Sequence, residues 1–594
     1  SPDQTKLLFA LHNGTAGVFD IKTMKLLGTF EHGDAIWLKE AGIYAHHAIL
    51  SGCFIDNTHF ATAGDDGKIR IWDINQPKPT GVLNREQAFF YGLKLTPDGR
   101  YLVGTDGEKA IRFIDIKTGE TAFSIISPDH ESVAVISKDG YYTANKKGLK
   151  SLTFLRTGRA YDFSQFDLYL NRPDKVLEQF GYASPETINL YRKAFAKRME
   201  KTDTAGISNK IFSPGYAAPD IAIKDLPDEL AETAESSLKL VLSATDATAV
   251  ISTLFVSVNG VPLYGTKGYR LKQAKAGSSL EIPLEIPLSS GNNAITISVM
   301  NRNKVESLRE NINIRRTGAA PKPNLYMIAI GSGASLNKDK KLEFPAKDAS
   351  DVAALLSRSP LFGKVQQTLL VNEKVTRPAF IKLKEQLLKT RPDDYVVVFY
   401  SGHGILDTAL NYYLSTYDTD FSHPRARAIP YEDFENLLDS IPSRNKVLLL
   451  DACHSGEADR EAMKGGFRTT KGDLQMEGGL AVKSGSRLIP GAQSSFHLMQ
   501  SLFSDLRTSN GATIIAAAGA SQYAVEGEPW KNGVFTYSLK SALEEKKADL
   551  NKDGIIYLSE LLEYLQGRVV ELTNGNQQPC SRKENIVNDL AIWQ

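Results

Sequence analysis

Apolar residues occur in short continuous runs throughout the last part of the chain, from residue 324 onward. The runs are LYMIAIG at 325–331, VVVFYSG at 396–402, VLLLDA at 447–452 and TIIAAAG at 513–519. Such runs are typical of parallel strands that are covered on both faces. The segments between them are amphipathic with helical spacing, at 346–359, 377–390 and 431–441. The pattern therefore predicts a doubly wound, mostly parallel α/β domain over residues 322–594.

Polar and apolar residues alternate over residues 236–316. The alternating stretches are LKLVLSATD at 238–246, TLFVSVNG at 253–260, SLEIPLEIPL at 279–288 and NAITISVMN at 293–301. Alternation with period two, interrupted by turn residues such as Asn259-Gly260, is typical of antiparallel strands with one buried face. We expect a small immunoglobulin-like β-sandwich here.

Residues 1–162 read as short strands separated by turns, in a loose repeat. A Pro-Asp turn, a β-rich run and a [VI]xD[IV] segment recur, so that Asp20, Asp73 and Asp115 are spaced by roughly 40–50 residues, the period of a four-stranded propeller blade. The repeat, with its Trp72-Asp73 pair, resembles WD-repeat propellers. About four blades are visible, and the chain starts inside a blade pattern, so we expect an incomplete propeller segment with further blades upstream.

The stretch from 163 to 235 is interpreted as a helical linker. Its clearest helix starts with Ser184 as the N-cap and Pro185 at the first helical position. A proline-rich segment at 213–229 follows it.

Composition narrows the class of protein. The 594 residues include 70 Lys and Arg and 69 Asp and Glu, so the net charge is +1. The excess of basic residues that is typical of nucleic-acid-binding proteins is not seen. The longest apolar runs are too short to cross a bilayer, so we expect a cytoplasmic protein without a membrane partner. With only Cys53, Cys453 and Cys580, a disulfide scaffold is not expected and a thiol is available for chemistry.

Two strand ends carry chemically active side chains. His403 follows VVVFY by three residues, and Cys453 follows VLLL by three residues. In open α/β sheets, functional groups gather on loops beyond the carboxyl ends of the strands, so we expect imidazole and thiol to meet at one edge. A nearby imidazole raises the reactive thiolate fraction of a cysteine. The backbone N–H groups of Gly404 and Cys453 are candidates for stabilising an oxyanion.

The motifs YSGHG (400–404) and DACHSG (451–456) resemble those of the caspase-like cysteine peptidases, in the metacaspase and bacterial caspase branch. The resemblance covers residues 322–594 and includes LEFPAKDASDV and GVFTYSLKSAL. It implies His403 as the general base and Cys453 as the nucleophile of a cysteine endopeptidase. The segment around the cysteine differs from that of animal caspases, so cleavage after aspartate is not implied.

Charge predicts a different substrate preference. Asp451 precedes Cys453 by two residues, and Glu526 lies four residues after Gln522, at an offset where metacaspases carry an acid. Two carboxylates in the pocket for the P1 side chain would favour Arg or Lys. Because Glu526 is longer than the usual Asp, the choice between Lys and Arg stays open, and Glu528 is an alternative acid.

A long insertion separates the cysteine strand from the next strand, at 457–510. It is rich in glycine, serine and basic residues, and loops of this length are commonly functional or disordered. If the pocket prefers cations, Lys464, Arg468 and Lys471 are candidate self-cleavage sites that would release an activation loop.

The segment DLNKDGIIYLSE, residues 549–560, matches the EF-hand loop pattern. Its candidate calcium ligands are Asp549, Asn551, Asp553, the carbonyl of Ile555 and Glu560. A second, paired EF-hand is missing, and a metal-free turn that caps a helix is the alternative.

The sequence as a whole predicts a multidomain cysteine endopeptidase that acts on a protein or peptide substrate. The propeller would bind a protein partner and regulate the peptidase, and no cofactor is needed for the chemistry. Two alternatives remain: an inactive caspase-like interaction scaffold, and another cysteine acyl transfer such as transpeptidation.

Overall fold

The computed structural model divides the chain into two compact units, Ser1–Tyr191 and Arg192–Gln594. It describes residues 1–33, 36–38, 43–45, 47–83, 89–107, 110–129, 132–149, 152–156, 158–201, 218–224, 231–272, 275–319, 321–407, 409, 411–452, 480–482, 510–518, 524–583 and 589–594.

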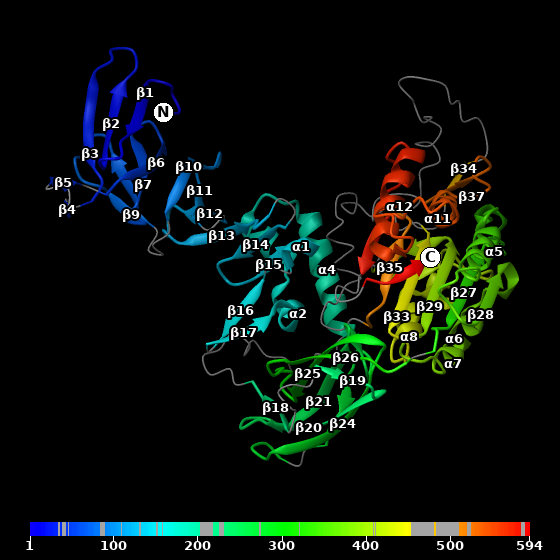
Figure 1. The fold of residues 1–594 in the computed structure, drawn as a ribbon. Helices are drawn as coiled ribbons and strands as arrows, with labels where there is room; N and C mark the ends of the chain where they lie inside the picture. Colours follow the sequence, from blue (N-terminus) through cyan, green and yellow to red (C-terminus); the bar gives the residue numbers. More distant parts are fainter. Residues whose placement is uncertain are drawn as a thin grey trace. The chain divides into compact units, whose positions relative to one another are not determined.

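The first unit is a succession of antiparallel sheets, coloured blue to cyan in Figure 1. The first has three strands, β1 (Lys6–Ala10), β2 (Thr15–Asp20) and β3 (Leu26–Glu31), and is followed by the hairpin β4 (Ile36–Leu38) and β5 (Ile43–Ala45). The second has four, β6 (Ile49–Phe54), β7 (His59–Gly64), β8 (Ile69–Asp73) and β9 (Gly81–Leu83). The third has six, β10 (Phe90–Leu95), β11 (Tyr101–Asp106), β12 (Ala110–Asp115), β13 (Thr121–Ile126), β14 (Ala134–Ser137) and β15 (Tyr142–Ala144). The repeated Asp20, Asp73 and Asp115 each end a strand, so the sequence repeat corresponds to repeated sheets, whereas a propeller stays a prediction.

A buried polar network joins the first two sheets. His32, which directly follows β3, lies 2.9 Å from the Thr62 hydroxyl through Nδ1 and 3.3 Å from the Asp66 carboxylate through Nε2. Trp72 Nε1 donates to the same hydroxyl at 2.7 Å, and Arg70 pairs with Asp66 at 2.8 Å. Because the Asp66 carboxylate can only accept, the neutral imidazole carries its proton on Nε2, and Nδ1 accepts from the Thr62 hydroxyl.

Short helices complete the first unit. They are α1 (Lys146–Leu149), α2 (Asp167–Leu170) and α3 (Pro173–Phe180), with the hairpin β16 (Thr153–Arg156) and β17 (Arg159–Asp162) and the 3-10 turn Phe163–Gln165. Phe180 of α3 packs edge-on against Phe113 and Phe123 of the third sheet, with ring centroids 5.3 and 5.2 Å away. Helix α4 spans Pro185–Lys201, and the Ser184 hydroxyl accepts from the Thr187 N–H at 3.3 Å, as expected of its N-cap.

The second unit contains a sandwich of two sheets, in which the strand pairs are antiparallel except for β19 with β26. One contains β18 (Asp220–Lys224), β20 (Ser237–Thr245) and β24 (Leu280–Pro287). The other contains β19 (Glu232–Thr233), β26 (Glu310–Arg316), β25 (Gly291–Asn301), β21 (Ile251–Val258), β22 (Val261–Pro262) and β23 (Tyr269–Arg270). Leucine, isoleucine and valine side chains from both sheets form one core between them. Strands β18 and β19 lie within the predicted linker, where flanking prolines obscured the short alternation of Ile221 and Ile223.

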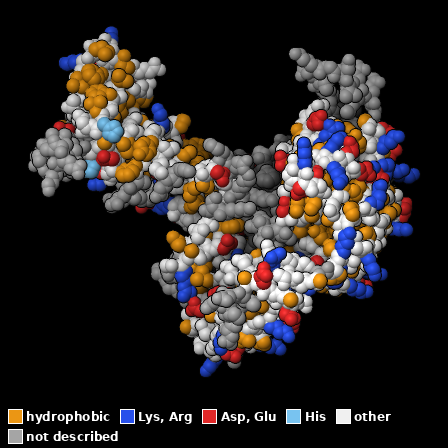
Figure 2. All heavy atoms as spheres, in the orientation of Figure 1, with side chains coloured by type: hydrophobic (Ala, Val, Ile, Leu, Met, Phe, Trp, Pro, Cys, Tyr) orange, Lys and Arg blue, Asp and Glu red, His pale blue; other side chains and the backbone are white. Residues whose placement is uncertain are grey.

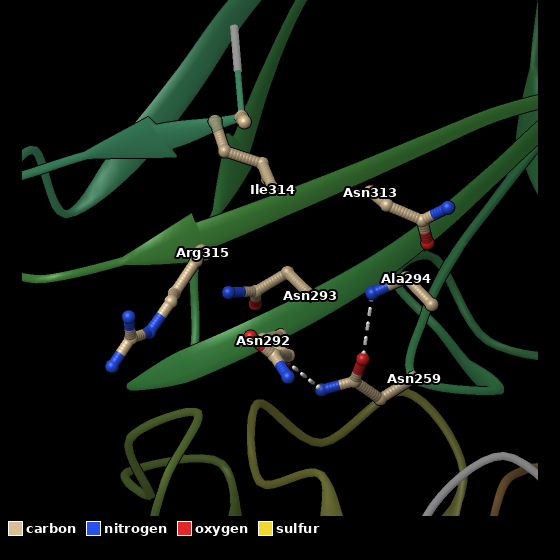
Figure 3. Close-up of a pocket in the computed structure, with 8 residues that line it drawn as sticks. Asn259, Asn292, Asn293, Ala294, Asn313, Ile314 and Arg315 are labelled. Carbon is tan, nitrogen blue, oxygen red and sulfur yellow. Dashed lines mark hydrogen bonds between the residues drawn. The ribbon is translucent and has the colours of Figure 1, made fainter.

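A hollow of about 520 Å³ lies on the sandwich, lined by asparagines and Arg315 (Figure 3). Asn259 donates to the Asn292 carbonyl and accepts from the Ala294 N–H, and Asn293 bonds both backbone groups of Ser289. The side-chain amides of Asn259 and Asn293 thus hold the connections between strands in place. We assign no function to this hollow.

The α/β domain has a six-stranded sheet in the order β28-β27-β29-β33-β35-β39. The strands are β27 (Leu325–Ser332), β28 (Val365–Val371), β29 (Tyr395–Gly402), β33 (Asn445–Asp451), β35 (Thr513–Ala516) and β39 (Cys580–Lys583). All pairs are parallel except β35 with β39. The predicted, mostly parallel sheet is therefore confirmed.

Helices cover both faces of this sheet. Helices α5 (Pro345–Leu356), α11 (Val534–Glu544) and α12 (Leu558–Leu572) share one apolar core with it. On the other face lie α6 (Arg377–Lys382), α7 (Lys384–Leu387) and α8 (Tyr431–Leu438), where Phe434 packs on Phe380 and Tyr400. Smaller sheets are β30 (Gly404–Leu406) with β31 (Tyr412–Leu414) and β32 (Ile429–Pro430); β34 (Leu480–Val482) with β36 (Val525–Gly527) and β37 (Asn532–Gly533); and β38 (Ile556–Tyr557) with β40 (Ala591–Trp593). The 3-10 turns are Lys338–Lys340, Asn372–Lys374 and Pro424–Ala426.

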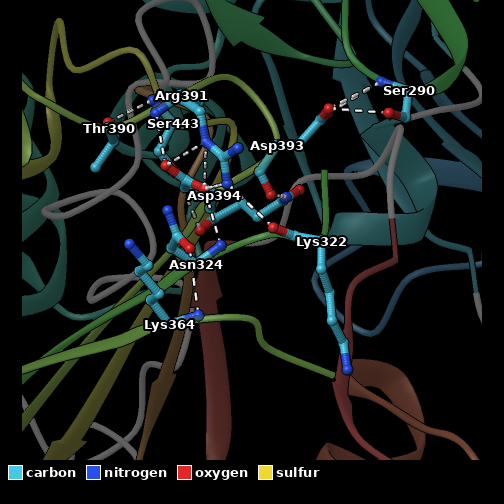
Figure 4. A network of polar contacts seen from close by, with 10 residues as sticks. Ser290, Lys322, Asn324, Lys364, Thr390, Arg391, Asp393, Asp394 and Ser443 are labelled. Carbon is cyan, nitrogen blue, oxygen red and sulfur yellow. Dashed lines mark hydrogen bonds and ion pairs between the residues drawn. The ribbon is translucent and has the colours of Figure 1, made fainter. Parts of the chain in front are cut away.

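Polar contacts attach the sandwich to the amino end of this sheet (Figure 4). Asp393 accepts from both the N–H and the hydroxyl of Ser290, each at 3.0 Å. The buried Arg444 donates to the Ser289 hydroxyl at 2.7 Å, and burial lowers the pKa of its guanidinium to about 10. The sandwich therefore braces the edge of the sheet opposite to the carboxyl ends of the strands.

Basic and acidic side chains are interspersed over the visible face of the second unit (Figure 2). This mixture agrees with the near-zero net charge. Among the described residues, no helix is long and apolar enough to span a membrane.

The neutral His32 makes the first unit sensitive to acid. Burial, and then the nearby Arg70, lower the pKa of His32 to about 4, from 6.5. Because the pKa of His32 is lower in the folded state than in the unfolded state, the contribution of the neutral ring to the free energy of unfolding is complete above pH 6.5. This contribution is lost as the pH falls toward 4, at a cost of up to about 3 kcal/mol. We expect the urea midpoint of the first unit to fall between pH 7.5 and pH 5.0.

The matched control is His32→Gln, which does not titrate in this range. Its midpoint should be lower at pH 7.5 and should change much less with pH. An equal change with pH in both proteins would contradict the assignment to His32.

Candidate active site

The two strands that carry the predicted catalytic residues are neighbours in the sheet. Strands β29 and β33 pair in parallel, and Ser401 lies directly opposite Asp451. His403 follows β29 at once, because the strand runs two residues beyond the predicted end at Tyr400. The loops after both strands therefore start at the same edge, as predicted. Cys453 itself lies outside the described residues, which end here at Ala452.

His403 is held in a buried position. His403 is 4% exposed, and its ring packs edge-on against the ring of Phe421, with the two ring centroids 5.4 Å apart. Its Nε2 lies 2.8 Å from the Lys340 carbonyl oxygen, which can only accept, so Nε2 carries a proton. In the neutral ring, Nδ1 is then the basic nitrogen. Sequence reasoning missed this role of Lys340, since a backbone carbonyl leaves no signature in the side chains.

Gly402 is required by close packing beside the histidine. A Cβ atom at this position would lie 2.5 Å from the Tyr400 hydroxyl oxygen and 3.1 Å from Ser332 Cβ. The Tyr400 hydroxyl is fixed in turn, because it donates to the Ser415 carbonyl at 2.9 Å. Gly404, the second glycine of the motif, begins β30 and is buried. Its proposed role in stabilising an oxyanion stays a prediction.

The two predicted pocket acids are buried, and each accepts a hydrogen bond from a neutral donor. Asp451 is 0% exposed, and its Oδ2 accepts from the Thr536 hydroxyl of α11 at 2.8 Å. Glu526 is 1% exposed, and its Oε1 accepts from the Glu343 N–H at 2.8 Å. Glu528, the alternative acid, is exposed. Contact of these carboxylates with a substrate stays a prediction.

The polar residues beneath the site were not anticipated. Ser401 and Thr536 are both 0% exposed and sit among apolar neighbours, in the segments VVVFYSG and GVFTYSL. A buried hydroxyl requires a partner, so a polar residue on an otherwise apolar stretch was the available signal. Their partners, Asp348 and Asp451, could not be paired with them from the sequence.

The remaining cysteines are unsuited to nucleophilic chemistry. Cys53 and Cys580 are free thiols, and burial raises the pKa of Cys53 to about 11 and that of Cys580 to about 12. Neither forms an appreciable thiolate near neutral pH. The predicted self-cleavage sites Lys464, Arg468 and Lys471 lie outside the described residues.

The EF-hand-like segment forms a tight loop before α12. Asp549 Oδ2 accepts from the Gly554 N–H at 3.0 Å, and Gly554 has φ +85°, a conformation that favours glycine. Glu560 accepts from the N–H groups of Asn551 and Tyr557. Within the described part of the chain, no three His, Cys, Asp or Glu side chains gather into a metal cluster. Calcium binding stays a prediction.

The contact with Lys340 predicts the tautomer of His403. In a Cys453→Ala protein with ¹⁵N-labelled histidine, long-range ¹H–¹⁵N spectra at pH 8 should show His403 protonated on Nε2. The signal is assigned by its loss in the His403→Ala, Cys453→Ala double variant. A ring protonated on Nδ1 would contradict the geometry.

Comparison with known proteins gives this edge of the sheet a family context. Residues 328–590 match the family model of the caspase domain, Peptidase_C14. Among solved structures, protein GSU0716 from Geobacter sulfurreducens is 19% identical, over 44% of this chain and 92% of that one, with a TM-score of 0.30. The WD40 β-propeller domain of Doa1 is 21% identical, over 24% of this chain and 46% of that one, with a TM-score of 0.18. This family match supports a caspase-like cysteine peptidase domain over residues 328–590.

Proposed function

We propose that the chain is a caspase-like cysteine endopeptidase that uses a Cys453–His403 dyad and cleaves after Arg or Lys. The observation that carries the proposal is the parallel pairing of β29 and β33, with Ser401 opposite Asp451. Since His403 and Cys453 each follow this pair by two residues, their loops leave the sheet side by side.

The dyad supplies a nucleophile and a proton carrier. His403 Nδ1 takes the proton of the Cys453 thiol, and the thiolate attacks the carbonyl carbon of the scissile peptide. The N–H groups of Gly404 and Cys453 stabilise the resulting oxyanion. As the C–N bond breaks, the imidazolium returns its proton to the leaving amine. Water, deprotonated by His403, then hydrolyses the thioester. The Lys340 carbonyl keeps Nδ1 as the working nitrogen throughout.

Two acids are proposed to set the preference for a basic P1 residue. Asp451 accepts from the Thr536 hydroxyl and Glu526 accepts from the Glu343 N–H, and these two neutral donors help to orient the carboxylates. A guanidinium or ammonium group is complementary to such a pair of carboxylates. On this assignment the metacaspase branch describes the chain better than aspartate-specific caspases.

Regulation is proposed to involve the other parts of the chain. Cleavage at Lys464, Arg468 or Lys471 would activate the peptidase, and the first unit, with its propeller-like repeats, would bind a protein partner. If calcium binds at 549–560, Asp549, Asn551, Asp553, the Ile555 carbonyl and Glu560 would hold it by oxygen coordination. Bound there, the ion would order the start of α12. The competing function is an inactive scaffold, which would not need the dyad.

The peptidase assignment predicts a distinct substrate profile. In a panel of fluorogenic peptides with Arg, Lys or Asp at P1, the wild-type chain should cleave after Arg and Lys only. Cys453→Ala and His403→Ala should each reduce kcat/KM by at least about 10³-fold, since both act in the same chemical step. Glu526→Gln should reduce it by about 10–100-fold for Arg and Lys, because a charge-assisted hydrogen bond contributes about 1.5–3 kcal/mol.

Cleavage after Asp would contradict the pocket assignment, and activity unaffected by both dyad substitutions would contradict the peptidase. Running the panel in EGTA and in added calcium, with Glu560→Gln as the matched variant, tests whether calcium contributes. A calcium-dependent gain that Glu560→Gln lacks would support the EF-hand-like loop as its site.

The self-cleavage hypothesis predicts a change in the protein itself. On incubation, the wild-type chain should yield two fragments on a denaturing gel, whereas Cys453→Ala should remain intact. A triple Lys464→Gln, Arg468→Gln, Lys471→Gln variant should also remain intact while keeping the dyad. Identical band patterns for wild type and Cys453→Ala would exclude cleavage by its own thiol.

A further inference from the structure

The ammonium group of Lys340 lies over an aromatic ring that itself contacts the proposed base. Lys340 Nζ is 5.6 Å from the centroid of the Phe421 ring, a distance at which the face of a ring attracts a cation. The same ring packs edge-on against the imidazole of His403, with the two centroids 5.4 Å apart. The carbonyl oxygen of Lys340 holds His403 Nε2 at 2.8 Å. One lysine therefore reaches the surroundings of His403 with both its backbone and its charged end.

The Phe421 ring is a fixed support for this ammonium group. The ring is half-buried and packs against a small apolar cluster that includes Ile405 of β30 and Tyr413 of β31. Strand β30 begins directly after His403 and pairs with β31. A lysine on the surface has a flexible stem, whereas an ammonium group attracted to a fixed ring is restricted to one region. The charge of Lys340 is therefore held near the proposed base.

The proposed mechanism brings one substrate residue to this side of the site. His403 returns its proton to the leaving amine, and the nitrogen atom of that amine belongs to P1′, the residue after the scissile bond. The backbone of P1′ must therefore come within hydrogen-bond reach of His403 when the C–N bond breaks. The P1′ side chain is attached one atom further on, next to the groups that pack around the imidazole.

We propose that Lys340 is a specificity-determining residue whose ammonium group binds an acidic side chain, Asp or Glu, at P1′. The inference rests on the proposed function, since it uses His403 as the proton donor to the leaving amine. A carboxylate at P1′ forms a charge-assisted hydrogen bond with the ammonium group. A neutral side chain forms a weaker one, and a basic side chain is repelled. The proposal extends the specificity of the site from P1 to P1′.

The charges around Lys340 agree with an acidic P1′ residue. The turn that carries it reads KDKK at 338–341, with three lysines and one aspartate. In the segment that carries the aromatic ring, Asp418 pairs with Arg427 at 2.8 Å, and Asp420 lies 3.2 Å from the His423 ring. These two acids therefore have partners within their own segment. A substrate with a basic P1 and an acidic P1′ residue is complementary to a site with carboxylates on one side and an ammonium group on the other.

The isosteric pair Asp and Asn at P1′ isolates the charge of the substrate. Internally quenched peptides share Arg at P1 and differ only at P1′, so the ratio of kcat/KM for Asp to that for Asn cancels any change in the dyad itself. We expect this ratio to be at least about three in the wild-type chain at low salt. It should fall to about one or below in Lys340→Gln, which removes the ammonium group and retains the carbonyl that holds His403.

Three further variants serve as controls for this ratio. Lys341→Gln removes an exposed charge from the same turn and should leave the ratio within about twofold of wild type. Lys340→Arg keeps the charge and should keep the preference for Asp. Phe421→Leu keeps an apolar side chain but removes the ring on which the ammonium group rests, so its ratio should fall toward one.

Alkylation of Cys453 reports the same charge without any peptide. A positive charge near the thiol raises the rate constant for anionic iodoacetate relative to that for neutral iodoacetamide. At pH 7, Lys340→Gln should lower the ratio of these rate constants by at least about twofold, and Lys341→Gln should leave it nearly unchanged. Burial raises the pKa values of Cys53 and Cys580 to about 11 and 12, which keeps these thiols from contributing.

The outcomes distinguish this proposal from the proposed function. A wild-type ratio of Asp to Asn at or below one, or a ratio that Lys340→Gln leaves unchanged, would overturn the role of Lys340 while the peptidase stands. If Lys340→Gln does not fold, Phe421→Leu decides in the same way. If no peptide is cleaved, the proposed function fails, and alkylation decides on Lys340: a lower ratio in Lys340→Gln supports its charge beside the dyad, and an unchanged ratio overturns it.

Discussion

The parallel pairing of β29 with β33 is the constraint on which the site depends. Hydrogen bonding of these strands fixes Ser401 opposite Asp451, and each strand then releases a loop that begins with a reactive residue two positions later. His403 and Cys453 are separated by 50 positions in the chain, and this register brings the strands that precede them to the same edge of the sheet. A slip of one residue would turn the side chains of one strand to the other face of the sheet, so the register decides which side chains of β29 and β33 share a face.

Beneath that edge of the sheet lies a layer of buried polar groups. They form directional hydrogen bonds, which apolar side chains cannot form. Ser401 bonds Asp348 of α5, and Asp451 bonds the Thr536 hydroxyl of α11, so each strand end is fastened to a helix on the same face of the sheet. Burying a carboxylate without hydrogen-bond donors would lower the free energy of unfolding. When donors are in place, their directional hydrogen bonds fix the carboxylate and its partners in one geometry. At the opposite end of the strands, Arg444 and Asp393 fasten the sandwich. The sheet is thus held at both ends by directional contacts.

The sequence was informative wherever a residue type reports its own environment. Continuous apolar runs predicted the parallel strands, the alternation in LKLVLSATD predicted the sandwich, and the run before His403 predicted that this residue directly follows a strand. It was uninformative for contacts made by the backbone, such as the Lys340 carbonyl, and for long-range pairs such as Asp348 with Gly533. Strand β18 was missed because nearby prolines suggested a linker, although Ile221 and Ile223 alternate as a strand requires.

The central claim is that the imidazole of His403 activates the thiol of Cys453, and titration of that thiol tests it most directly. Thiolate absorbance at 240 nm can be followed from pH 4 to 9, a range in which Cys53 and Cys580 remain protonated because burial raises their pKa values to about 11 and 12. The account predicts a single thiolate with a midpoint well below the usual value of about 8.5. That midpoint should rise to about 8.5 or above in His403→Ala. The same midpoint in both proteins would contradict the account.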